Sequence, residues 1–455
     1  MVNDMTVGKP LKNILMMSLP IMAGNLFQQF YGMADAIIVG RYLGSGPLAA
    51  VGATSSLYYL ILWFATGVTS GFVVLISQFF GAGDYKQMRK KLCLAVSLTG
   101  IITLIMTTFS VVYVKKLLIV MNTPEEILTD AFRYIVIILL GLAATMVYNL
   151  SAAVLRALGD SRTPLYFLVL TSVMNIVLDL VFIRVLKLGT AGAALATVIS
   201  QACSGLLCTV YMYRHFEILH ICRDDWKHFR RPETVQMLKL GLPLGIQGAI
   251  TASGVIVLQI AVNSYGADGI AAFTAANKVE QLVSQILAAY SVTIVNYVGQ
   301  NYGAKKIDNI RTGVRDCLFL VLVTAALGGV LLYCFGGFVA GWFLDVPNPR
   351  VLEYAREYLS RSALFLWAFG MLCMYRSSIQ GMGDPRGPLL NGVIESVSRI
   401  LWTAYLIKWG TFHQLCFANP ATWTLAAAVL VIFYRCKMKK LAVSYDPGSK
   451  TSEQG

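Results

Sequence analysis

Charged side chains are scarce in this sequence. Only 13% of its 455 residues are Asp, Glu, Lys or Arg, whereas a soluble globular domain usually carries about 25%. Apolar residues make up 57%, so the composition excludes a disordered chain, a nucleic-acid binder and almost any ordinary soluble enzyme. The formal net charge of +14 reflects a shortage of acids, 23 against 37 bases, and its meaning depends on where the bases lie.

Motifs of catalysis and metal binding are also missing. None of the nine cysteines is spaced as CxxC, and most lie in apolar runs, which favours buried free thiols over disulfides or zinc ligands. The sequence has no GxxxxGK[ST] loop, so direct use of ATP is not expected. The four histidines are loosely spaced, and no nucleophile–base constellation stands out. We therefore expect neither an enzyme nor a structural metal site.

Apolar windows long enough to cross a membrane recur along the whole chain. Crossing about 30 Å of hydrocarbon takes about 20 mostly apolar residues in a helix. Most of the windows are free of charge, and the others carry one or a few ionisable residues. The sequence therefore predicts an all-α integral membrane protein with twelve transmembrane helices, at 13–40, 48–80, 91–114, 129–155, 163–184, 190–213, 236–262, 269–299, 311–343, 352–377, 387–407 and 418–436.

The bases are divided unevenly between alternate loops. With a cytoplasmic N-terminus, 25 Lys and Arg residues fall in inner loops and tails and seven in outer loops. The positive-inside rule then predicts that both termini are cytoplasmic. The basic balance thus indicates topology rather than a polyanion site, and we expect a multi-pass protein of the cell (plasma or inner) membrane.

The two halves of the sequence resemble each other at an offset of about 222 residues. The best match, between 155–164 and 379–388, shares G-D-x-R-x-P after the fourth span of each half. Its predicted local role is a tight turn, in which Gly takes unusual backbone angles and Pro starts the next helix. Further matches join 18–20 to 241–243, 48–50 to 270–272 and 78–82 to 300–304.

The repeat predicts two pseudo-symmetric six-helix bundles that enter the membrane from the same side, as in some transporters that work by alternating access. We expect an N-lobe over 1–213, a cytoplasmic linker over 214–235, a C-lobe over 236–437 and a cytoplasmic tail over 438–455.

Several motifs resemble a known family. The paired L-P helix starts, the Q-x-x-G-A turns, L-x-A-x-G-D-x-R-x-P and the run from Asn175 to Asp179 look like those of the multidrug and toxic compound extrusion (MATE) transporters, over about 10–436. The resemblance implies a V-shaped twelve-helix fold and antiport of amphipathic, often cationic organic compounds against H⁺ or Na⁺. It implies no cofactor besides the coupling ion. The expected partners are small-molecule substrates and membrane lipids, and we expect a monomer.

Two carboxylates lie inside predicted spans. Asp35 precedes Arg41 by six residues and Asp179 precedes Arg184 by five, which places both roughly 8–9 Å from the outer helix ends. The second half has Leu258, Arg399 and Thr403 where the first has Asp35, Asn175 and Asp179. Because the fold does not require carboxylates there, we interpret the first set as functional. The alternative is local pairing, of Asp35 with Arg41 and of Asp179 with Arg184 or Lys187.

Within the family, this half most resembles the DinF-type branch. That resemblance implies a cation- or proton-coupling site at Asp35, Asn175, Asp179 and Thr197, with Na⁺ binding possible at the first three, and a helix bend at Pro20. For Pro20, a kink near a helix start, shared with Pro243, is an equally good interpretation. Expected cavity residues, each as readily explained by an ordinary interhelical contact, are Gln28, Gln29, Tyr31, Tyr148 and Asn149.

The second half carries a different set of intramembrane charges. Glu395 and Arg399 have i,i+4 spacing and are expected to pair. Glu280 stands at the repeat position of Tyr58, and it either binds a cation or cationic substrate or is neutralised by nearby Lys278.

Two other functions fit twelve repeated spans. A lipid-linked precursor flippase of the same superfamily would need a cavity rich in Arg and Lys, whereas the expected N-lobe cavity is acidic and amidic. A membrane receptor or scaffold is the third possibility, but the sequence shows no ligand-binding domain.

Overall fold

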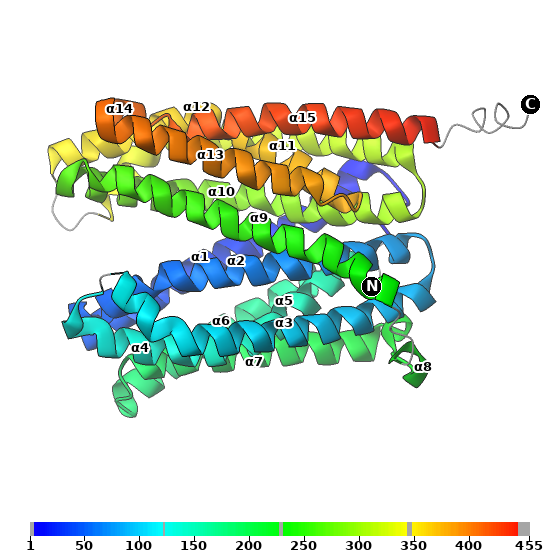
Figure 1. Cartoon of the computed structure of the whole chain (residues 1–455), viewed down its shortest axis with the longest axis horizontal. Helices are drawn as coiled ribbons and strands as arrows, with labels where there is room; N and C mark the ends of the chain where they lie inside the picture. The colour runs from blue at the N-terminus through cyan, green and yellow to red at the C-terminus, as the bar shows by residue number, and fades with distance from the viewer. Residues whose placement is uncertain (1–3, 122, 227–230, 344–347, 445–455) are drawn as a thin grey trace, which may run out of the picture. The chain divides into compact units, whose positions relative to one another are not determined.

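A computed structural model describes residues 4–121, 123–226, 231–343 and 348–444, and within these ranges all regular structure is helical (Figure 1). The elements are α1 (Pro10–Leu43), α2 (Ser45–Gly81), α3 (Tyr85–Val120), α4 (Glu125–Leu140), α5 (Leu142–Ala157), α6 (Arg162–Leu180), the π-helix η1 (Val181–Val185), α7 (Thr190–His215), the 3₁₀ helix η2 (Glu217–Leu219), α8 (Arg223–Trp226), α9 (Arg231–Asn263), α10 (Gly266–Gly303), α11 (Ile307–Gly341), α12 (Pro349–Gly381), α13 (Arg386–Trp409), α14 (Phe412–Leu415) and α15 (Ala418–Ser444).

The twelve predicted spans correspond one by one to long helical segments. The fourth is the pair α4 and α5, which bends by 45°, and the fifth continues from α6 into η1. Among the described residues, nine helices are long and apolar enough to cross a membrane, or ten with the bent pair. The other two segments, α1 and α13, are less apolar, and they carry Asp35 and the Glu395–Arg399 pair respectively.

Most helices extend beyond the predicted limits. Helix α1 begins at Pro10, and α9 begins at Arg231. Pro20 and Pro243 therefore lie inside helices rather than near their starts, and the predicted placement at a helix start is wrong. Helix α15 continues to Ser444, so the first part of the predicted tail is helical, and 445–455 lies outside the described residues.

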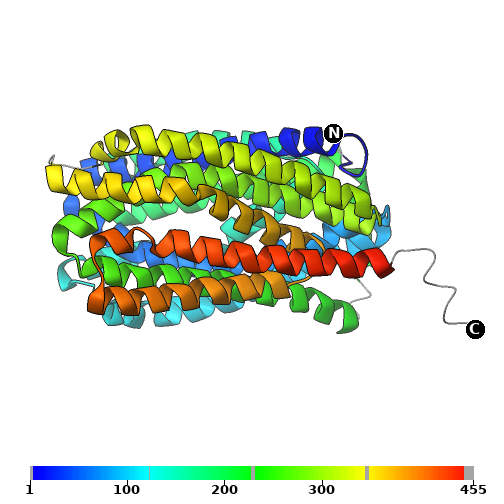
Figure 2. The same ribbon diagram turned by 90° about the horizontal axis from the view of Figure 1, so that it is seen from above.

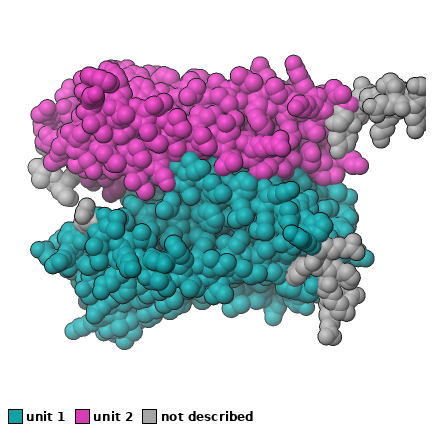
Figure 3. Space-filling model, in the orientation of Figure 1, with its two compact units in different colours: residues 1–4, 17–252 teal, residues 5–16, 253–455 magenta. Residues whose placement is uncertain are grey.

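Contacts divide the chain into two compact units, coloured separately in Figure 3. Unit 1 comprises 1–4 and 17–252, and unit 2 comprises 5–16 and 253–455. The boundary thus falls inside α9 rather than in the predicted linker over 214–235. Described residues of that linker pack within unit 1: Phe216 and Leu219 are 2% and 3% exposed in its hydrophobic core, and Asp225 pairs with Arg89 at 3.3 Å.

Small residues allow close helix packing in unit 1. A Cβ atom added to Gly71 of α2 would lie 2.6 Å from the Cα atom of Gly241 in α9, and one added to Gly67 would lie 2.5 Å from the carbonyl oxygen of Leu244. Such small-residue contacts are how membrane helices approach closely without a hydrophobic driving force. In unit 2, α10 and α11 both pack along α12, which also contacts α15 (Figure 2).

The repeated G-D-x-R-x-P segments form matching turns, as predicted. Gly159 and Gly383 have φ of 83° and 74°, values that favour glycine. The carboxylate of Asp160 accepts hydrogen bonds from the backbone N–H and hydroxyl of Thr163, at 3.0 and 2.7 Å. Asp160 and Asp384 each accept a hydrogen bond of 3.1 Å from the equivalent backbone N–H, that of Arg162 or Arg386. Asp384 also accepts from the Lys437 Nζ at 2.6 Å.

Residues 5–16 near the N-terminus belong to unit 2. The backbone N–H of Met5 donates to Gln300 Oε1 at 2.8 Å, and Asn301 Nδ2 donates back to the Met5 carbonyl at 3.2 Å. Lys306 Nζ donates to the Thr6 carbonyl at 2.9 Å. Residues 5 and 6 are therefore hydrogen-bonded to the segment around the Q-x-x-G-A turn of the second half. Met5 is only 1% exposed.

Candidate functional site

The two intramembrane carboxylates of unit 1 meet. Asp35 comes from α1 and Asp179 from the last turn of α6, and their side chains interact directly. Asn175 lies one turn before Asp179 on α6, and both residues are 0% exposed. Two carboxylates in contact cannot both stay ionised without a neutralising partner.

Polar atoms at this contact lack hydrogen-bond partners. Among the described residues, no partner is found for Asp35 Oδ1, for either carboxylate oxygen of Asp179, or for the amide oxygen and nitrogen of Asn175. Leaving a buried polar atom unsatisfied costs about 1–3 kcal/mol, and more for a charged group. A proton shared between the carboxyls, or a small cation held by their oxygens and the Asn175 carbonyl, would remove that cost.

Local ion pairs do not supply the missing partner. The described residues contain no ion pair between Asp35 and Arg41, or between Asp179 and either Arg184 or Lys187. The guanidinium of Arg184 lies over the Tyr42 ring instead, 6.0 Å from its centroid. The alternative interpretation by local pairing therefore does not describe this structure.

Three tyrosines surround the carboxylates. The Tyr31 hydroxyl of α1 lies beside Thr197 of α7 and near both acids. Tyr58 of α2 and Tyr134 of α4 belong to the same electrostatic cluster, and both were missed. The repeat held a signal for Tyr58, because it stands where the second half has Glu280.

The other expected cavity residues do not gather at this point. Tyr148 is 8% exposed in the hydrophobic core of unit 1, near Arg156 and Cys208, so its assignment to the cavity is wrong. Gln28 is exposed, and Gln29 and Asn149 are half-buried.

Unit 2 holds a second buried polar cluster. The Glu280 carboxyl lies beside Tyr358 and Ser362 of α12, and it interacts electrostatically with Arg399 of α13. As predicted, Arg399 pairs with Glu395: Nη1 lies 3.1 Å from Oε2. Asn391 Nδ2 donates to Glu395 Oε1 at 2.8 Å, and Asn419 Nδ2 donates to the Tyr358 hydroxyl at 3.1 Å.

Lys278 does not neutralise Glu280. Its ammonium lies over the Phe343 ring, 5.3 Å from the centroid, while Glu280 is 4% exposed and its nearby base is Arg399. The expectation of a Lys278–Glu280 pair is therefore wrong, because the side chains of two residues separated by one position leave the helix in different directions.

The two clusters occupy corresponding positions of the repeat. Tyr58 corresponds to Glu280, and, at the 224-residue offset that aligns 155 with 379, Tyr134 corresponds to Tyr358 and Asn175 to Arg399. The second cluster thus contains a permanent cation where the first has a neutral amide and an unpartnered acid pair. Among the described residues, the unit 1 cluster therefore lacks the fixed positive charge that Arg399 supplies in unit 2.

The donor set at Asp35 and Asp179 suits a single proton or a monovalent cation. In the part of the chain that the structure describes, no three His, Cys, Asp or Glu residues converge as a metal site would require. Two carboxylates and one amide carbonyl are hard oxygen donors, which small hard cations prefer.

Comparison with known proteins identifies the family. The MatE family model matches residues 20–181 and 243–404. The chain is 29% identical over 438 residues to the probable multidrug resistance protein YpnP of Bacillus subtilis, covering 95% of this chain and 96% of that one. It is 25% identical to the probable multidrug resistance protein NorM of Thermotoga maritima, covering 87% and 84% of the two chains.

Solved structures show the same fold. An outward-facing multidrug resistance MATE family transporter of the MOP superfamily superposes with a TM-score of 0.90 at 22% identity, over 96% of this chain and 98% of that one. A MATE in a bent conformation gives 0.89 at 23% identity, over 97% and 98%. The protein therefore belongs to the MatE family and is a multi-pass membrane transporter with the twelve-helix fold of that family.

Proposed function

We propose that the protein is a secondary active antiporter that exports amphipathic, cationic organic compounds in exchange for H⁺ or Na⁺. The names of its relatives, which are probable multidrug resistance proteins, support multidrug efflux as the transported class. The observation that carries the coupling is the proximity of half-buried Asp35 to buried Asp179, two acids without a cationic partner among the described residues.

Competition for one acidic site explains exchange. With the site empty, the acid pair is negative and favours an organic cation. Loading by an ion neutralises the pair and lowers the affinity for that cation. Because linkage is reciprocal, bound substrate weakens ion binding by the same factor. Alternating access of the two units then converts inward ion flow into outward substrate flow.

Each surrounding group has an assigned role. Asp35 and Asp179 hold the ion, and the Asn175 carbonyl completes its coordination if the ion is Na⁺. Tyr31 and Thr197, whose side chains lie together, position α1 against α7 beside the acids. Pro20 lies inside α1 and removes one intrahelical hydrogen bond, so it is the point at which α1 would bend during transport.

The buried cluster of unit 2 has a different role in this proposal. Arg399 is paired with Glu395, so it leaves Glu280 without a full counter-charge of its own, and we assign Glu280 to attraction of the cationic substrate rather than to ion exchange. The 25 to 7 bias of bases supports cytoplasmic termini. We assign the protein to the cell membrane and treat it as a monomer.

The test is gradient-driven efflux of a fluorescent organic cation from sealed proteoliposomes. Asp35→Asn should lower the initial rate at least tenfold, because a neutral amide cannot alternate between charge states. The matched control is Asp308→Asn, since the Asp308 side chain is 96% exposed. Normal efflux by the Asp35 variant would overturn its role in coupling.

The same vesicles identify the ion and test the rival function. Replacing Na⁺ by choline abolishes efflux under Na⁺ coupling, whereas a protonophore abolishes it under H⁺ coupling. A lipid-linked precursor flippase would translocate a pyrophosphate-bearing lipid and leave the organic cation inside under every gradient.

A further inference from the structure

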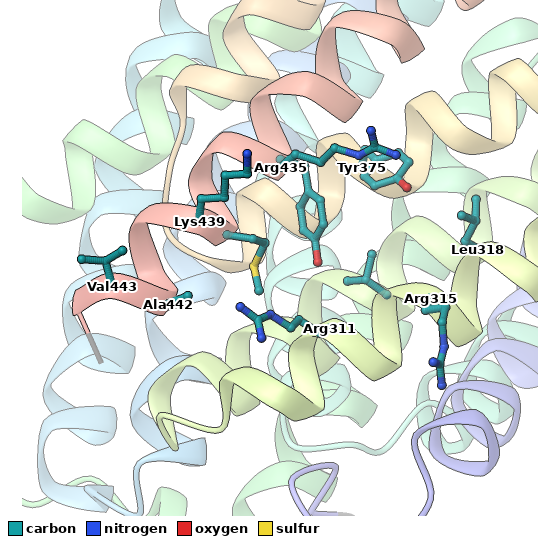
Figure 4. Close-up of a pocket in the computed structure, with 11 residues that line it drawn as sticks. Arg311, Arg315, Leu318, Tyr375, Arg435, Lys439, Ala442 and Val443 are labelled. Atoms are coloured by element: carbon teal, nitrogen blue, oxygen red, sulfur yellow. The ribbon is translucent and has the colours of Figure 1, made fainter. Parts of the chain in front are cut away.

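A basic cavity lies in unit 2, far along the sequence from the acid cluster. It has a volume of about 730 Å³ and is lined by side chains of α11, α12 and α15. Arg311 and Arg315 come from the first turns of α11, and Arg435 and Lys439 come from the last turns of α15. In Figure 4, Arg435 and Lys439 of α15 lie on one side of the cavity and Arg311 of α11 lies on the other, with Arg315 extending away from this group.

No acid lines this cavity. Arg311 and Arg315 have only loose contacts with exposed or neighbouring acids, at 3.7 Å to Asp308 and 3.8 Å to Asp316, and exposed pairs of this kind contribute little. Arg435 and Lys439 have no ion-pair partner within the described ranges, whereas Lys437 between them is bound to Asp384 at 2.6 Å. The cavity therefore carries more positive charge than the described acids beside it neutralise.

Two tyrosines form the inner wall. The rings of Tyr375 and Tyr434 lie 5.2 Å apart between centroids, and the two residues are 8% and 9% exposed. Arg435 lies near the Tyr375 hydroxyl and Arg311 near the Tyr434 hydroxyl. Guanidinium and phenol groups that line one cavity can donate hydrogen bonds to phosphate oxygens, which accept several at once.

The same helices continue into apolar surface. Val314, Leu318 and Met438 complete the lining, and beyond the cavity α11 exposes Phe319, Leu322 and Leu327 at 62%, 38% and 63%. Because α11 and α15 are among the membrane-crossing helices, their charged ends lie at headgroup level and their apolar stretches lie among acyl chains.

We propose that this cavity binds the phosphodiester headgroup of an anionic phospholipid, with an acyl chain along the exposed face of α11. Basic pockets between transmembrane helices are the usual sites of such headgroups. A free phosphate would find the same donors, but it would gain nothing from the adjoining apolar surface, so the lipid is the occupant that the whole cavity fits. This proposal does not depend on the coupling site.

The test compares lipid retention by native mass spectrometry of the full chain in detergent. Phosphatidylglycerol should remain bound in preference to phosphatidylcholine. In the double variant Arg435→Gln/Lys439→Gln, phosphatidylglycerol affinity should fall about 30-fold, which corresponds to about 1 kcal/mol for each base removed near an anionic headgroup. The control Lys86→Gln/Arg214→Gln removes two exposed bases elsewhere and should retain the lipid.

A single variant and two soluble competitors test the same cavity in other ways. The single variant Lys439→Gln changes only an exposed side chain, and its affinity for phosphatidylglycerol should fall about fivefold. It tests the cavity even if the double variant misfolds. Inorganic phosphate and glycerophosphoglycerol should displace the lipid only at far higher concentration. Equal retention of both phospholipids, an unchanged double variant, or displacement by phosphate at the lipid's own concentration would each overturn the proposal.

Discussion

Arg399 Nη1 lies 3.1 Å from Glu395 Oε2, with each side chain only 5% exposed. Asn391 holds the other carboxylate oxygen at 2.8 Å. Arg399 stands at the repeat position of Asn175 in unit 1, and Glu395 stands at that of Thr171, whereas Asp179 has no hydrogen-bond partner among the described residues. Unit 2 therefore has a fixed positive charge, Arg399, beside its buried acid. Among the described residues, Asp179 of unit 1 has no such partner.

Removing Arg399 should destabilise the protein strongly. Arg399→Gln leaves Glu395 charged and buried, which costs about 3–5 kcal/mol. The measurement is the free energy of unfolding of the purified protein in detergent. The double variant Glu395→Gln/Arg399→Gln should recover at least half of the loss, because no unpaired charge then remains. A single variant as stable as the wild type would show that the pair is not desolvated.

Replacing Asp179 should reduce ion-driven accumulation of substrate without stopping substrate counterflow. In Asp179→Asn, the remaining Asp35 cannot share a proton or a small cation with a second carboxylate. We expect ion-driven accumulation in proteoliposomes to fall at least tenfold, while substrate counterflow without an ion gradient continues. Asp316→Asn, which changes a carboxylate of α11 outside the cluster, is the control. Equal loss of counterflow and accumulation would indicate a role in substrate binding or folding instead.

The turn at Asp384 should contribute pH-dependent stability. Burial alone would raise the pKa of this carboxyl, but the hydrogen bonds from Lys437 and from the Arg386 backbone outweigh burial and hold the pKa below its usual value. The stabilisation is therefore complete above the unfolded pKa of about 3.9 and is lost as the pH falls through the lower folded pKa.

Comparison of Asp384→Asn with the wild type measures this effect. At pH 7 the variant should be less stable by about 1 kcal/mol, a modest value because both partners are partly exposed. The difference should shrink below about pH 4. Asp308→Asn should show no such trend, and a gap that widens in acid would contradict the assignment.

Lys305 occupies a backbone conformation that favours glycine. Its φ is 59°, and the first half of the repeat has Gly83 at the corresponding position, with φ of 73°. Lys305→Gly should therefore stabilise the protein by about 1 kcal/mol, and Gly83→Ala should destabilise it by a similar amount. Thermal unfolding of the two variants checks both signs. The neighbouring Lys306→Gly should instead destabilise, because it removes the hydrogen bonds to Thr6.

Hydrophobicity and the internal repeat predicted the fold well, because each span is a local property of about 20 residues. Helix ends were predicted too short, since charged residues such as Arg231 and Lys439 continue helices beyond the apolar stretch. For the site, depth along a helix follows from residue counting, so the similar depth of Asp35 and Asp179 was predictable.

Contacts between distant helices were less predictable. Tyr134 and Tyr148 both lie in apolar spans, yet Tyr134 faces the acids and Tyr148 faces the core. Which tyrosine faces the acids depends on how its helix is rotated about its axis. The 45° bend between α4 and α5 changes that rotation between Tyr134 and Tyr148. For the same reason, Lys278 was one of two alternatives offered for Glu280, whereas the base near Glu280 is Arg399, more than a hundred residues away in the sequence.

The paired turns at Gly159-Asp160 and Gly383-Asp384 have an evolutionary consequence. A duplicated gene that keeps its turns keeps both copies folding, which leaves the buried polar positions free to diverge independently. One copy could then acquire a permanent positive charge by substitution, as at Arg399, while the other kept its acid pair without one. An ancestor with two identical halves would have carried two equivalent sites, and asymmetry between them would have been a later specialisation.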